Sequence, residues 1–109
     1  MQATLISTKQ FDVQITALLR RDELGEFAIA SRPDGNPVIP RTDGVRKARW
    51  SRQGLGKRGG LRIIYYYSEH HGVALLMAAY AKNVQENLTD DQKKQIRSLV
   101  ARFRERLGA

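Results

Sequence analysis

Residues 61–81, LRIIYYYSEHHGVALLMAAYA, predict two strands joined by a tight turn. Leu61 to Tyr67 is rich in β-branched and aromatic residues, which favour strands. Val73 to Ala81 is a continuous apolar run, which suits a strand buried on both faces. The polar segment Ser68 to Gly72 lies between them, and a hairpin turn is the simplest connection. We therefore expect these two strands to form a hairpin within an antiparallel sheet.

The segments around the hairpin predict a third strand and a long helix. Val45 to Ser51 alternates, so that one face carries Lys47 and Arg49 while the other carries Arg46. Thr89, followed three residues later by Gln92, matches a capping box at the start of a helix. That helix has one apolar stripe, formed by Ile96, Leu99, Val100, Phe103 and Leu107.

The N-terminal part adds a short strand and two short helices. Thr4 to Ser7 is a strand candidate, and a helix is expected from Phe11, where apolar residues recur at helical spacing. A second helix is expected from Asp22 to Ser31, before the turn residues that follow. The predicted order is β-α-α-β-β-β-α, a small α+β domain with an antiparallel or mixed sheet. We expect residues 1–109 to form this single domain.

Composition excludes several classes of protein. An apolar content of 41% suits a globular chain and is too high for a disordered one. No apolar run approaches the ~18 residues that span a bilayer, and Met1 to Gln10 lacks the features of a signal peptide. The chain has no cysteine, and its only histidines, His70 and His71, cannot form a metal site alone. We therefore expect a cytoplasmic protein without a membrane segment, a metal or a cofactor.

Positive charge is concentrated between Arg41 and Arg62. This stretch holds eight basic residues and one acid, so it carries +7 of the net charge of +8. A basic cluster of this kind is typical of proteins that bind nucleic acid. The alternative is a solvated basic loop that only aids solubility.

A glycine-rich loop interrupts the basic stretch. Residues 54–59, GLGKRG, match G-x-G-x-x-G, but a dinucleotide site would precede a helix and this motif precedes a strand. A P-loop is also excluded, because Arg58 stands where magnesium needs Ser or Thr. We expect a hairpin loop in which the glycines allow the backbone to approach a phosphate, while Lys57 and Arg58 supply charge.

Several cations are expected on one face of the sheet. Across the loop, Lys47 and Arg49 can face Arg62, which should share its face with Tyr66. Lys82 and Asn83 end the last strand beside this face. A cationic surface beside an aromatic ring suits RNA. We assign RNA contacts to Arg46, Lys57, Arg58, Tyr66 and Asn83.

Four segments together resemble the HigB-like branch of RelE-type toxins. They are GVRKARW at 44–50, GKRGGLRIIYYY at 56–67, YAKN at 80–83 and ENLT at 86–89. The similarity runs from about Asn36 to the C-terminus. The resemblance implies a type II toxin, a metal-independent endoribonuclease that cuts mRNA, usually in the ribosomal A site. It also implies a cognate antitoxin, which in this branch usually carries a helix-turn-helix domain.

The resemblance further implies which residues act on the RNA. In such toxins the 2′-hydroxyl attacks the adjacent phosphate, giving a cyclic phosphate and a 5′-hydroxyl end. Lys47, Arg49, Arg62 and Lys82 match the basic positions of the family, and fixed cations stabilise the charge that develops on the phosphate. Arg62 is the candidate for holding the phosphate, because a guanidinium donates two parallel bonds. Lys47 and Lys82 are candidates for the general base, because neighbouring cations favour a neutral amine.

Two other functions are compatible with a basic α+β domain. A gyrase poison of the ParE kind shares the fold, but those relatives generally lack the cations at Lys47, Arg49, Arg62 and Lys82. A non-catalytic module that binds RNA or the ribosome needs positive charge without a particular arrangement, so single substitutions would weaken it gradually.

Overall fold

The computed structural model describes residues 2–18, 23–50, 60–82, 84, 85 and 87–108. Its elements follow the predicted order: β1 (Thr4–Ser7), α1 (Lys9–Leu18), α2 (Glu23–Ser31), β2 (Val45–Trp50), β3 (Leu61–Ser68), β4 (Val73–Ala81) and α3 (Asp90–Leu107). The predicted α+β class is thereby confirmed. Within the described ranges, no helix is long and apolar enough to cross a membrane.

The four strands form one mixed sheet in the order β1-β4-β3-β2. The predicted hairpin is confirmed, since β3 pairs antiparallel with β4 and β2 pairs antiparallel with β3. β1 pairs with β4 in parallel, which makes the sheet mixed. A register shift between Ile64 and Tyr65 marks an irregularity in the pairing with β4. The β3–β4 hairpin thus forms the centre of the sheet. Residues of β4 are buried on both faces, as its apolar run predicts.

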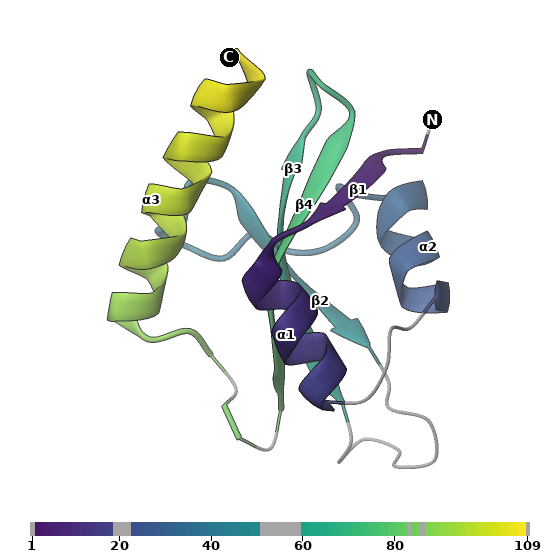
Figure 1. Ribbon diagram of the computed structural model, residues 1–109, viewed down its shortest axis with the longest axis vertical. Coiled ribbons are helices and arrows are strands. Elements are labelled where there is room, and N and C mark those ends of the chain that lie inside the picture. Colours follow the sequence, from purple (N-terminus) through teal and green to yellow (C-terminus); the bar gives the residue numbers. More distant parts are fainter. Residues whose placement is uncertain (1, 19–22, 51–59, 83, 86, 109) are drawn as a thin grey trace.

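Helices cover both faces of the sheet (Figure 1). On one face, Phe11 and Ile15 of α1 and Ile29 of α2 pack against alternate residues of the strands, including Ile63 and Tyr65. On the other face, the predicted stripe of α3 packs against the sheet, with Ile96 and Val100 buried. The basic residues of β2 and β3 that point to the second face therefore share it with α3.

Local hydrogen bonds explain where two helices begin and where α3 ends. The side-chain oxygen of Thr8 accepts a bond from the Phe11 amide at 3.0 Å, so Thr8 stabilises the start of α1. The predicted capping box of α3 is present, with reciprocal bonds between Thr89 and Gln92. Gly108 ends α3 at φ 77°, a left-handed conformation that glycine adopts without a steric penalty.

A buried tyrosine fixes the segment between α2 and β2. The Tyr65 hydroxyl donates to the Pro33 carbonyl oxygen at 2.7 Å and accepts a bond from the Asn36 amide at 3.1 Å. Burial raises the pKa of Tyr65 above its usual 10.0, although the Asn36 hydrogen bond acts in the opposite direction. The phenol is therefore held in its neutral form in the folded protein.

We expect this tyrosine to make the protein less stable in alkali. Because the pKa of Tyr65 is higher in the folded state than in the unfolded state, stability is lost as the pH rises from about 10 through the raised value. Tyr65→Phe should lower the free energy of unfolding at pH 7 by about 1–3 kcal/mol. It should also lose less stability than the wild type when the pH is raised to 11. Urea unfolding at pH 7, 9 and 11 measures both effects. If the two proteins lost equal stability at pH 11, Tyr65 would not be the cause of the loss.

Candidate RNA-binding and cleavage site

Strand pairing places a row of functional side chains across the sheet. Arg49 of β2 is the register partner of Arg62 of β3, and Arg62 is the partner of Tyr80 of β4. Lys47 lies two residues before Arg49, so it points to the same face. The expectation that Lys47 and Arg49 share a face with Arg62 is therefore confirmed. This row lies at the end of β3 and β4 opposite their connecting turn.

A cleft of about 290 Å³ opens on this row. Lys47, Arg49 and Tyr80 line it from the sheet, and residues 37–40 line it from the segment before β2. Asn87, Leu88 and Lys93 line it from the start of α3 and the residues before it. Three of these side chains are cations, and none of the described lining residues is acidic. We call this hollow the cationic cleft.

A hydrogen bond between Lys47 and Asn87 spans the cationic cleft. The Lys47 ammonium donates to the side-chain oxygen of Asn87 at 3.3 Å. It joins β2 to the segment that leads into α3, which are forty residues apart in the sequence. The Lys47 nitrogen is thus held inside the cleft by a neutral partner, which leaves its charge available to an anion.

A tight turn before β2 shapes one wall of the cleft. The Thr42 hydroxyl is buried, donates to the Ile39 carbonyl oxygen at 2.6 Å and accepts a bond from the Val45 amide at 3.1 Å. Arg41 and Asp43 adopt positive φ angles of 64° and 60°, which are unusual for residues other than glycine. Gly44 follows at φ 96°. The buried Thr42 hydrogen bonds compensate for this uncommon backbone geometry.

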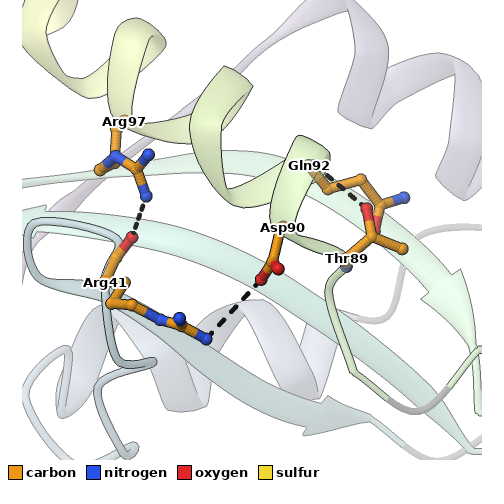
Figure 2. Close-up of polar contacts among 5 residues, drawn as sticks. All are labelled: Arg41, Thr89, Asp90, Gln92 and Arg97. Atoms are coloured by element: carbon orange, nitrogen blue, oxygen red, sulfur yellow. Dashed lines mark hydrogen bonds and ion pairs between the residues drawn. The ribbon is translucent and has the colours of Figure 1, made fainter.

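The same turn is joined to α3 (Figure 2). The Arg97 guanidinium donates to the Arg41 carbonyl oxygen at 2.6 Å, and the Arg41 side chain lies 3.6 Å from the Asp90 carboxylate. The ion pair is largely exposed and contributes little by itself. The charged hydrogen bond from Arg97 is the stronger contact. Together they set the position of α3 relative to the turn, and hence the distance between the walls of the cationic cleft.

Arg62 lies below the surface of the cleft. Its side chain is only 5% exposed, and it is not among the lining residues. Its two register partners, Arg49 and Tyr80, both line the cleft. Arg62 therefore lies on the same face of the sheet as the cleft, and its burial in a low local dielectric strengthens its interaction with a nearby anion.

Two of the expected RNA contacts lie away from the cationic cleft. The Arg46 guanidinium donates to the backbone oxygens of Asp34 and Asn36, so it holds the segment before β2 and lies on the face of α1 and α2. Tyr66 is partly buried against α3, where its ring meets Phe103 edge-on at 6.3 Å between centroids. The structure does not bring either side chain to the cleft.

The other predicted site residues are placed as follows. Lys82 is exposed just after β4, and its amide donates to the Gly60 carbonyl oxygen at 3.0 Å, but its side chain does not line the cleft. Lys57, Arg58 and Asn83 lie outside the described residues. The expected glycine-rich loop also lies there, apart from Gly60.

Besides residues 37–40, sequence reasoning missed four residues that line the cationic cleft. Tyr80, Asn87 and Leu88 stand inside segments that carry the family resemblance, but no role was assigned to them. No sequence pattern indicated a role for Lys93, because a lysine in the first turn of an amphipathic helix usually faces solvent. Its position in the cleft follows from how α3 is fixed to the turn before β2.

Comparison with known proteins identifies the family and supports the fold. The sequence model described as "RelE toxin of RelE / RelB toxin-antitoxin system" matches residues 41–107, which include β2, β3, β4 and α3. The fold is similar to that of free E. coli toxin RelE, solved as a variant with two arginines changed to alanine. That match has a TM-score of 0.51 and 10% identity, and it covers 79% of this chain and 90% of the other. The chain therefore belongs to the RelE toxin family, whose members are the toxins of toxin–antitoxin pairs.

Proposed function

We propose that this toxin is a metal-independent endoribonuclease that cuts mRNA in the ribosomal A site and so inhibits translation. The observation that carries the proposal is the cationic cleft, which brings Lys47, Arg49 and Lys93 together over the buried Arg62. A phosphodiester in this cleft would meet cations from three sides and no described carboxylate. The resemblance of the sequence to the HigB-like branch supports the same activity.

The proposed reaction needs positive charge and a base. The 2′-hydroxyl oxygen forms a bond to the adjacent phosphorus, the bond to the 5′-oxygen breaks, and that oxygen takes up a proton. Arg49 and Arg62 stabilise the extra negative charge on the phosphorane. Lys47 is the better-placed candidate for the base that accepts the 2′ proton, because it lines the cleft and Lys82 does not.

A cognate antitoxin is implied by membership in a toxin–antitoxin family. We propose that this antitoxin is HigA-like, with a helix-turn-helix DNA-binding domain, and that it inhibits the toxin by tight binding. Copurification of the toxin with the product of the neighbouring gene, followed by a DNA-binding assay, tests this part.

Primer extension tests the proposed activity. Purified toxin is added in EDTA to a defined mRNA, either free or on ribosomes with an empty A site. New 5′ ends within the A-site codon, seen only on ribosomes, are expected. Cuts on free RNA would support the nuclease activity and show that it does not require the ribosome. A folded protein that cuts in neither setting would refute the proposal and favour a binding module or a gyrase poison.

The two adjacent lysines of α3 provide a matched test of where the RNA lies. Lys93 lines the cationic cleft, whereas Lys94 is exposed and does not. Lys93→Met should weaken binding of an uncleavable 2′-O-methyl RNA and reduce the slope of log affinity against log salt by about one. Lys94→Met removes the same charge from the same turn and should change the slope much less. Equal effects of the two substitutions would mean that the RNA does not occupy the cleft.

A further inference from the structure

A second hollow lies beside the cationic cleft, and it has a different chemical character. Its volume is about 120 Å³, and it lies between α1, the second half of β4 and α3. Five glutamines line it: Gln10, Gln14, Gln85, Gln92 and Gln95. None of its described lining residues is charged. We call it the glutamine pocket.

The glutamine pocket forms where the sheet edge is left open. β3 pairs with one edge of β4 along its length, but β1 pairs with the other edge only as far as Leu76. Beyond Leu76, no described strand lies beside that second edge. Side chains from α1 and the residue before it cover this edge instead. Gln14 accepts a bond from the Ala79 amide at 2.9 Å, and the Thr8 hydroxyl donates to the Met77 carbonyl oxygen at 3.0 Å. Polar side chains thus form hydrogen bonds with the backbone groups of this edge, and a hollow remains between α1 and α3.

The glutamines divide into two groups by their hydrogen bonds. The Gln85 and Gln92 side chains bond to each other, and Gln92 also forms the capping box of α3. Gln14 uses its oxygen on β4. Within the described part of the chain, the side-chain amides of Gln10 and Gln95 make no hydrogen bond. These two amides therefore have both donor and acceptor groups available for a ligand.

The glutamine pocket and the cationic cleft share a wall. Tyr80 and Leu88 line both hollows, so the two adjoin along the end of β4. Tyr80 is also the register partner of Arg62. A nucleotide has the same two parts, an anionic phosphate and a neutral planar base. Amide side chains donate to and accept from base edges, and an aromatic ring stacks on a base.

From this arrangement we infer that the glutamine pocket binds a nucleobase of the RNA whose phosphate occupies the cationic cleft. The inference rests on the proposed function and adds a part of the site that selects the base. Gln10 and Gln95 hydrogen-bond the base edge, and Tyr80 forms the side shared with the phosphate site. The pocket would give the toxin a sequence preference that contacts to the phosphate cannot supply, because phosphate contacts carry no sequence information.

Nuclear magnetic resonance with mononucleotides tests the inference without any cleavage. The four nucleoside 5′-monophosphates and ribose 5-phosphate are titrated into ¹⁵N-labelled toxin. Ribose 5-phosphate should shift only signals of the cationic cleft, such as Lys47. At least one nucleotide should also shift the side-chain amide signals of Gln10 and Gln95. The inference is overturned if nucleotides and ribose 5-phosphate shift the same set of signals, or if no nucleotide shifts the glutamine amides.

A double variant tests which groups hold the base. Gln10→Leu with Gln95→Leu removes two exposed amides that have no internal partner, so the fold should persist. Affinity for the best nucleotide should fall about tenfold, because a hydrogen bond contributes a factor of about 2 to 10. Affinity for ribose 5-phosphate should not change. Ser98→Leu is the matched control, since it lies on α3 outside the pocket.

The same variants separate this inference from the proposed function. If the toxin cuts mRNA, mapped 5′ ends should show a weaker base preference for the Gln10/Gln95 double variant than for Ser98→Leu. Unchanged cut sites and nucleotide affinity would overturn the inference while leaving the nuclease intact. Conversely, suppose that the toxin cuts no RNA while nucleotides still shift the amide signals of Gln10 and Gln95. That result would overturn the proposed nuclease activity and support the base pocket.

Discussion

Arg62→Met is expected to yield a folded toxin that cuts mRNA about 10²–10³ times more slowly than the wild type, because a preorganised cation contributes about this much to charge stabilisation. The Arg62 side chain is almost fully buried in the central strand β3. Methionine is similar in length and apolar, so it can fill the space of the arginine chain without burying a charge. The loss should therefore appear in the single-turnover rate and not in the free energy of unfolding.

Arg62→Lys distinguishes geometry from charge. Lysine keeps the positive charge but lacks the planar group that donates two parallel bonds. We expect it to recover only part of the rate, and urea unfolding of all three proteins serves as the control for folding. A stable Arg62→Met toxin that cuts within threefold of the wild-type rate would show that the buried arginine has no part in the reaction.

The combined substitution Lys47→Met and Arg49→Met should slow cleavage by at least about 10³-fold, since it removes a candidate base and a charge-stabilising group together. Both side chains line the cationic cleft from β2, and Arg49 is exposed. Substituting them leaves the apolar core unchanged, so the stability should fall little. The single-turnover rate on programmed ribosomes measures the effect.

A matched control for this double variant removes the same charge elsewhere. Lys94→Met with Arg102→Met lowers the net charge by two on the exposed side of α3, outside the cationic cleft. It should reduce the rate only slightly, through weaker attraction of the ribosome. If both double variants lost the same activity, the net charge of the protein would matter and the cleft would not.

The central elements of this fold could be predicted from the sequence because their patterns are local. The apolar run of β4 and the aromatic run of β3 bracket a short polar turn, and an alternating β2 precedes them. The ends of α3 follow from Thr89, Gln92 and Gly108. Alternation along β2 and β3 also predicted that Lys47, Arg49 and Arg62 share a face, because the side-chain period of a strand is two.

Other features depend on contacts between distant segments, and no local pattern carries them. Lys93 reaches the cleft because Arg97 and Arg41 fix α3 to the turn before β2. Arg46 carries charge in a basic stretch, yet it bonds to backbone oxygens on the opposite face. The glutamine pocket combines residues from α1 and α3 that are about eighty positions apart, so only the folded chain brings them together.

Single-turnover cleavage of a ribosome-bound mRNA in EDTA tests the proposed chemistry most directly, when the 2′-hydroxyl at the mapped cut site is either present or replaced by hydrogen. We predict that the natural mRNA is cut there, leaving a 5′-hydroxyl end, and that the 2′-deoxy mRNA is not cut at that position. Equal cutting of the two substrates, or a product with a 5′-phosphate, would contradict attack by the 2′-hydroxyl within the cationic cleft.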